Sequence, residues 1–246
     1  MKHPVWLFDL DNTLHDASHA AFGEMHVAIG DYVAEFVGIT GEEAQRLRER
    51  YWLRYGATLL GLVRHHGVPA AHFLAETHRM PGLEARVRTS AHDRAVLRRL
   101  PGKKVILTNA PRAYAMRVLD TLGLTKSFAE IVTIEDMTMF GSLRPKPDAR
   151  MLRRVAARLK VAPGRCVLVE DTLVHQKAAF GLGMRTVWMR RYLRGRPAAA
   201  AAPSPSPPAS QSHLPPQPGE RGAARRCRKP AYVGDRVVSL QALRRL

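Results

Sequence analysis

The chain has 246 residues, of which 46% are hydrophobic and 24% are charged, as is typical of globular proteins. This length suits one large α/β domain with room for a smaller insert. The longest apolar runs, such as residues 5–8 and 166–169, are far shorter than the about 20 residues of a membrane helix. Composition thus argues against a fibrous or membrane-spanning protein. The early acidic residues do not fit a secretory leader, so we expect a cytoplasmic protein.

The net charge of +18 comes from 39 basic and 21 acidic residues, and it raises the possibility of nucleic-acid binding. The arginines are spread along stretches with helical periodicity, however, and no nucleic-acid-binding signature accompanies them. We interpret them as a solvated surface and do not expect a nucleic-acid partner. Two cysteines, Cys166 and Cys227, are too few for a four-cysteine zinc site.

The first expected element is a buried strand at residues 5–8, which ends at Asp9. From about residue 18 to residue 76 the pattern becomes helical. Apolar side chains there recur at three- or four-residue spacing, as in Ala44, Leu47, Tyr51 and Tyr55. We therefore expect an all-helical block inserted directly after the first strand.

Strands and helices then alternate. We expect strands at residues 103–107, 131–134, 165–169 and 186–189, and helices at residues 111–123, 148–159 and 172–180. Such alternation predicts an α/β fold with a doubly wound, Rossmann-like parallel sheet and an inserted all-helical region. Ligands of these sheets bind beyond the carboxyl ends of the strands.

Residues 196–230 interrupt this pattern with alanine, proline, serine and arginine, and we expect a disordered insert there. Beyond it we expect a short strand at residues 231–233 and a last helix from Ser239 to Arg244. The predicted core domain comprises residues 1–16, 90–195 and 231–246, and the helical block comprises residues 17–89.

Polar residues of the types used in catalysis follow several of the expected strands. The segment DLDNTL places Asp9 and Asp11 just beyond the first strand, although a simple turn explains such a hexapeptide nearly as well. Three later segments favour a site: Thr108-Asn109 after the second strand, RPKPD at residues 144–148, and VEDT at residues 169–172.

In order and spacing, these four segments resemble the signature motifs of the haloacid dehalogenase-like hydrolase superfamily, in which the helical block is a cap over the active site. The resemblance implies that Asp9 is the nucleophile and that Asp11 is the general acid and base. It implies phosphate contacts from Thr108, Asn109 and Lys146. It also implies Mg²⁺ as cofactor, held by Asp9, Asp11, Asp171 and Glu170. Many relatives carry Asp or Asn where this chain has His175, so support of the metal from that position is an open question.

Three stretches, YWLRYGATLLG at residues 51–61, LPGKKVILTNA at residues 100–110 and RVLDTLGL at residues 117–124, are similar to the bacterial pyrimidine 5′-nucleotidase branch. This similarity implies a small phosphomonoester substrate, namely a pyrimidine nucleoside 5′-monophosphate. Tyr55, Thr58 and Leu59 are the candidate substrate-facing residues of the cap, with packing inside the helices as the alternative.

Other activities remain as alternatives at this point: a phosphatase of sugar phosphates or phospho-amino acids, a phosphomutase, or a non-enzymatic binding protein on the same fold. A dehalogenase lacks the acid at Asp11. A phosphonatase needs a cap lysine for a Schiff base, and the stretch from Asp16 to Glu76 contains no lysine.

Overall fold

The structure is a computed structural model that describes residues 3–88, 91–193 and 230–245. The predicted disordered insert at residues 196–230 lies outside the described residues, apart from Pro230. The centre of the molecule is a six-stranded parallel sheet in the order β3-β2-β1-β6-β7-β8. Its strands are β1 (Val5–Phe8), β2 (Lys103–Leu107), β3 (Glu130–Val132), β6 (Cys166–Glu170), β7 (Arg185–Met189) and β8 (Asp235–Val237).

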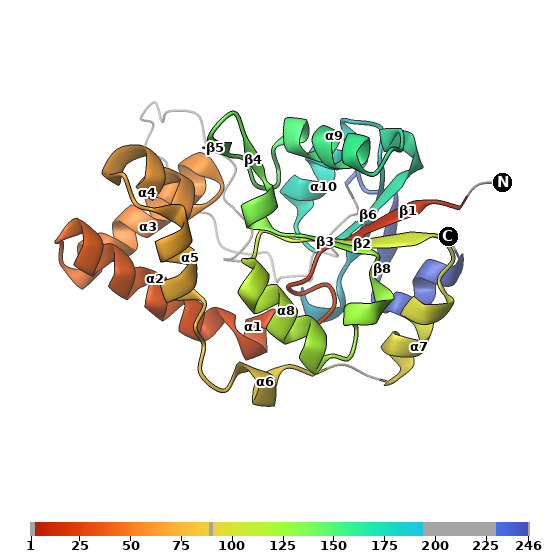
Figure 1. Ribbon diagram of the computed structural model, residues 1–246, viewed down its shortest axis with the longest axis horizontal. Coiled ribbons are helices and arrows are strands. Elements are labelled where there is room, and N and C mark those ends of the chain that lie inside the picture. Colours follow the sequence, from red (N-terminus) through yellow and green to blue (C-terminus); the bar gives the residue numbers. More distant parts are fainter. Residues whose placement is uncertain (1–2, 89–90, 194–229, 246) are drawn as a thin grey trace, which may run out of the picture.

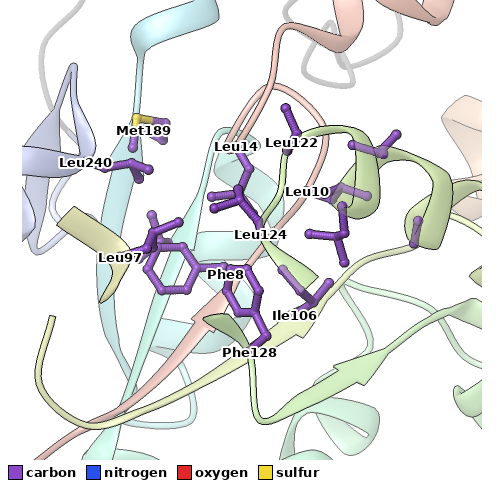
Figure 2. Close-up of a cluster of buried hydrophobic side chains, with 14 of the residues drawn as sticks. Phe8, Leu10, Leu14, Leu97, Ile106, Leu122, Leu124, Phe128, Met189 and Leu240 are labelled. Carbon is purple, nitrogen blue, oxygen red and sulfur yellow. The ribbon is translucent and has the colours of Figure 1, made fainter. Parts of the chain in front are cut away.

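Helices cover both faces of this sheet (Figure 1). They are α7 (Ala91–Arg99), α8 (Arg112–Thr121), α9 (Ala149–Arg158) and α10 (Leu173–Phe180). Side chains alternate along β1, so Leu7 packs in the cluster that includes α9 and α10, and Phe8 packs in the cluster that includes α7 and α8. Figure 2 shows the second of these clusters, in which Phe128 meets the ring of Phe8 edge-on at 5.8 Å between centroids. The predicted doubly wound α/β fold is confirmed.

A helical region, called the cap below, lies between β1 and α7 in the sequence, and its larger part stands apart from the sheet at the left of Figure 1. Its helices are α1 (Ala17–Ala20), α2 (Phe22–Val37), α3 (Gly41–Tyr55), α4 (Thr58–His66), α5 (Ala70–Thr77) and α6 (Leu83–Arg86). Thr40 and Glu43 form a capping box that begins α3, and Gly56, with a φ of 80°, ends it. The cap has its own hydrophobic cluster, which also takes in Ile134 from the segment after β3. No helix in the described ranges is long and apolar enough to span a bilayer.

Short elements connect these parts. They are the 3₁₀ helices η1 (Thr125–Ser127), η2 (Ile134–Asp136), η3 (Pro163–Arg165) and η4 (Arg191–Leu193), and the small hairpin of β4 (Thr138–Met139) and β5 (Ser142–Leu143). The strand expected at residues 131–134 therefore ends at Val132. The residues after it turn instead, because Thr133 and Asp136 form a capping box that begins η2.

The C-terminal strand lies four residues later than the sequence predicts. Instead of residues 231–233, the sheet takes Asp235–Val237, which pairs with β7. Val233 is buried but lies in a turn, with its amide donating to Pro230 O, and Gly234 passes so close to β7 that a Cβ there would lie 2.7 Å from Thr186 O. Only after this close approach can the chain pair. The expected last helix is a 3₁₀ helix, η6 (Leu240–Arg245).

Candidate active site

The carboxyl ends of three adjacent strands meet at one edge of the sheet. Asp9 follows β1, Thr108 follows β2, and Glu170 is the last residue of β6. The register pairs Phe8 with both Ile106 and Val169, which places Asp9 between the ends of its neighbouring strands. The Asp9 amide also donates to Val169 O at 3.0 Å. Residues that lie about a hundred positions apart are thereby brought into one site.

Lys146 is buried at the centre of this edge. Its Nζ donates to Asp9 Oδ1 at 2.7 Å and to Glu170 Oε2 at 2.8 Å. The side chain of Asn109 makes two hydrogen bonds to the backbone of Lys146. Asn109 Oδ1 accepts from Lys146 N, and Asn109 Nδ2 donates to Lys146 O, both at 2.9 Å. Asn109 therefore orients the lysine, a role for its side chain that the sequence motif did not indicate.

Three carboxylates converge beside this lysine. Each of Asp9, Glu170 and Asp171 offers an oxygen that lies within 4.8 Å of those of the other two. Glu170 Oε2 lies 3.1 Å from His175 Nδ1, and Thr172 N donates to its Oε1 at 3.1 Å. With Lys146 on Oε2 as well, both oxygens of Glu170 have donors from the protein.

The ionisation of the three carboxyls reflects these partners. Burial and the charge of Glu170 raise the pKa of Asp9 to about 7, although Lys146 opposes the shift. Burial, Glu170 and Asp9 likewise raise the pKa of Asp171 well above its ordinary value. Burial acts on Glu170 in the same direction, but Lys146 and His175 outweigh it and lower the pKa of that carboxyl.

Asp9 and Asp171 thus hold negative charge that the surrounding side chains do not fully offset. Carboxylate oxygens in such a cluster are the ligands that a hard divalent cation prefers. A cation there would offset the burial and the repulsion that raise both pKa values, so the donor set fits Mg²⁺. His175 acts on this site through Glu170, since its Nδ1 faces that carboxylate.

Asp11 has a different environment from Asp9. Tyr114 OH donates to its Oδ1 at 2.7 Å, and His15 Nε2 lies 2.9 Å from the same oxygen. His15 and Tyr114 are both almost fully buried. Sequence reasoning missed them. His15 stands four residues after Asp11, and Tyr114 shares helical spacing with apolar residues of α8. Nothing in the sequence therefore distinguishes either of them from an ordinary core residue.

Two hydroxyl groups complete the site. Thr108 Oγ1 accepts from Ala110 N at 3.1 Å, which leaves its hydrogen available for an anion. Thr13 Oγ1 donates to Asp9 Oδ2 at 3.3 Å and so supports the second oxygen of that carboxylate. Thr13 belongs to DLDNTL, but sequence reasoning gave it no role.

The three candidate cap residues lie around the turn between α3 and α4. A Cβ on Gly56 would lie 3.9 Å from Cδ of Pro147, so this turn reaches the loop that carries Lys146. Tyr55 is half-buried, and its OH lies 2.5 Å from His65 Nε2. Thr58 and Leu59 are buried, and the Thr58 hydroxyl donates to Arg48 O. Packing inside the cap accounts for the last two.

Comparison with known proteins agrees with this geometry. The family model described as haloacid dehalogenase-like hydrolase matches residues 5–183, which is most of the chain. The protein therefore belongs to the haloacid dehalogenase-like hydrolases. A curated relative is phosphate metabolism protein 8 of Saccharomyces cerevisiae, 23% identical over 193 residues. The match covers 73% of this chain but only 59% of the yeast protein, so it spans less than two thirds of that relative.

Solved structures share the fold at low sequence identity. CbbY from Rhodobacter sphaeroides in complex with phosphate has a TM-score of 0.58 and 18% identity, and the match covers 98% of this chain and 96% of CbbY. The HAD-hydrolase YfnB from Bacillus subtilis bound to magnesium has a TM-score of 0.55 and 16% identity, and the match covers 99% of this chain and 97% of YfnB. These likenesses establish the fold.

The buried ion cluster generates a prediction about stability. Replacing Lys146→Met leaves Asp9 and Glu170 without their cation, so we expect a loss of about 3–5 kcal/mol in the free energy of unfolding near neutral pH, measured by urea denaturation. Without the ammonium, both carboxyls bind protons more readily in the folded state. The loss should therefore shrink as the pH falls and protons replace the missing charge.

Lys126→Met is the matched control, because Lys126 is exposed on η1. It should change the free energy of unfolding by no more than about 0.5 kcal/mol. Equal effects of the two substitutions would contradict a central role for the Lys146 ion pairs.

Proposed function

We propose that this hydrolase is a magnesium-dependent phosphatase of small phosphomonoesters that works through an aspartyl-phosphate. The observation that carries the proposal is the group around Asp9: a buried carboxylate at a strand end, with the ammonium of Lys146 at 2.7 Å and a second acid, Asp11, two residues away. Covalent phosphoryl transfer needs a nucleophile, a positive charge beside it and a proton donor, and these residues supply all three.

In the proposed reaction a carboxylate oxygen of Asp9 attacks phosphorus, and the bond from phosphorus to the alcohol oxygen breaks. Asp11 gives its proton to that leaving oxygen. Asp11 then takes a proton from water as the water oxygen attacks the phosphorus of the aspartyl-phosphate. The bond to Asp9 breaks and inorganic phosphate leaves. Lys146 and the Thr108 hydroxyl offset the negative charge of the phosphoryl oxygens in both steps.

Asp9, Asp171 and the backbone carbonyl of Asp11 are the groups we propose for holding Mg²⁺, and Glu170 lines the same site. A bound Mg²⁺ would neutralise charge on the transferring phosphoryl group. Because protein donors already engage both oxygens of Glu170, we expect it to contribute less to the ion than Asp9 and Asp171 do. The magnesium in the related YfnB structure is consistent with this proposal.

For the substrate we propose a pyrimidine nucleoside 5′-monophosphate. The support is the sequence of the α3–α4 turn in the cap and its approach to Pro147, next to Lys146. Tyr55 is the last residue of α3, next to this turn, and is half-buried, and we propose it as the cap residue that meets the substrate. A sugar phosphate or a phospho-amino acid is the alternative, because the same catalytic groups serve any small monoester.

The mechanism predicts that Asp9→Asn abolishes phosphate release, because an amide cannot take over the nucleophilic attack. Phosphate release measured with Mg²⁺ should fall by at least about 10³-fold, while the circular dichroism spectrum stays unchanged. Asp120→Asn is the matched control, since Asp120 is exposed on α8, and it should keep full activity. Near-normal turnover by the Asp9→Asn protein would exclude Asp9 as the nucleophile.

Metal binding should show a defined pH dependence. In the metal-free protein the raised pKa values of Asp9 and Asp171 mean that folding favours their protonated forms, so stability falls as the pH rises towards about 7. Mg²⁺ must displace those protons at low pH but not at high pH. We therefore expect it to raise the thermal midpoint by several degrees at about pH 8 and by much less at about pH 5.5.

The Asp171→Asn variant tests which carboxylate holds the ion, since it should remove most of the rise in thermal midpoint that Mg²⁺ causes. A gain in midpoint that is independent of pH, or one that Asp171→Asn leaves intact, would rule out this cluster as the binding site.

The substrate is tested by a phosphate-release screen with Mg²⁺ over nucleoside monophosphates, sugar phosphates and phospho-amino acids. UMP and CMP should give the highest kcat/KM, and Tyr55→Ala should raise KM for them more than for 4-nitrophenyl phosphate. A preference for sugar phosphates would overturn the proposal of a nucleotide substrate, but the proposal of a phosphatase would still stand. Transfer of phosphate between positions of one sugar, without release, would indicate a phosphomutase.

A further inference from the structure

The acid Asp11 carries an unusual pair of contacts on one oxygen. Tyr114 OH donates to Oδ1 at 2.7 Å, and His15 Nε2 lies 2.9 Å from the same atom. The carboxylate oxygen accepts, so the geometry assigns the imidazole hydrogen to Nε2. Within the described part of the chain, no hydrogen bond reaches Oδ2. Two donors thus hold one oxygen of Asp11, while the other accepts no hydrogen bond from the described residues.

Both donors are themselves buried. His15 is completely buried and Tyr114 is 1% exposed, whereas the side chain of Asp11 is 17% exposed. The Tyr114 ring lies between two imidazoles, tilted against His15 and edge-on to His78 at 5.8 Å. A phenol and an imidazole buried this deeply for packing alone would incur a desolvation cost that phenylalanine and leucine avoid. Their polar groups converge on a single atom of the partly exposed acid.

From this arrangement we propose that His15 and Tyr114 are positioning residues for Asp11: they fix Oδ1 and present Oδ2 for proton transfer to the leaving oxygen. The inference rests on the proposed phosphatase function. A carboxyl that rotates freely spends only part of its time with the correct oxygen towards the substrate, whereas two donors on Oδ1 hold the plane of the group. His15 and Tyr114 therefore determine how fast the enzyme cleaves esters with a poor leaving group.

The test compares two esters that differ chiefly in their leaving group, phenyl phosphate and 4-nitrophenyl phosphate. Phenolate is the poorer leaving group and needs the proton from Asp11, while 4-nitrophenolate departs with little help. The readout is the ratio of kcat/KM for the two esters, because kcat/KM reports the step in which the leaving group departs. A general acid contributes about 10²–10⁴-fold, and its misplacement should remove part of that.

Tyr114→Phe keeps the ring and removes the hydroxyl, and His15→Leu removes the imidazole donor. Each should lower kcat/KM for phenyl phosphate by about 10-fold or more and for 4-nitrophenyl phosphate by less than about 3-fold. His15→Gln restores an N–H donor near the position of Nε2 and should recover most of the loss. Because both donors act on one oxygen, the double variant should lose less than the product of the two single losses.

Tyr32→Phe is the matched control, since Tyr32 is also a buried tyrosine whose OH meets a histidine, His72 at 2.9 Å, but inside the cap. It should leave the ratio unchanged. Equal losses on both esters, or none, in the Tyr114 and His15 variants would overturn the positioning role. Absence of phosphate release from the unmodified protein would overturn the proposed function itself and this inference with it, so the two failures are distinguishable.

Discussion

The ion pairs of Lys146 are the interaction on which the arrangement of the site depends. The ammonium touches Asp9 after β1 and Glu170 at the end of β6, while its backbone is clasped by Asn109 after β2. One residue thereby joins three strand ends that are far apart in the sequence. Charges buried this deeply are costly unless each is paired, so the cluster is stable only when the strands, the loop and the lysine are all in place.

This cluster also separates the carboxyls into different chemical states. Glu170 has donors on both oxygens and a lowered pKa, while Asp9 and Asp171 have raised pKa values. Glu170 therefore serves as the fixed counter-charge of the lysine. The negative charge that is available to a cation is concentrated on the other two carboxylates. A single network thus assigns different roles to groups of the same chemical type.

The sequence predicts the sheet well because buried parallel strands are short apolar runs bounded by turns, as residues 5–8 and 166–169 illustrate. The prediction fails at β8, because its Asp-Arg-Val sequence contains no such run, and the close approach of Gly234 to β7 just before it cannot be read from the sequence. Asp9 and Glu170 are foreseeable from their positions at strand ends, and Lys146 from the motif RPKPD. The contacts of Asp11 are not, since Tyr114 lies 103 residues from Asp11 along the chain, and nothing in the sequence marks His15, four residues after Asp11, as its partner.

Ile134 belongs to the segment after β3 but is buried to 4% exposure within the hydrophobic cluster of the cap. Any swing of the cap away from the sheet would expose this side chain to water. Full burial of an isoleucine contributes about 1.5–3 kcal/mol, so its exposure alone would oppose such a displacement roughly ten-fold or more. One apolar side chain outside the group of catalytic candidates thus helps to hold the cap helices against the segment after β3.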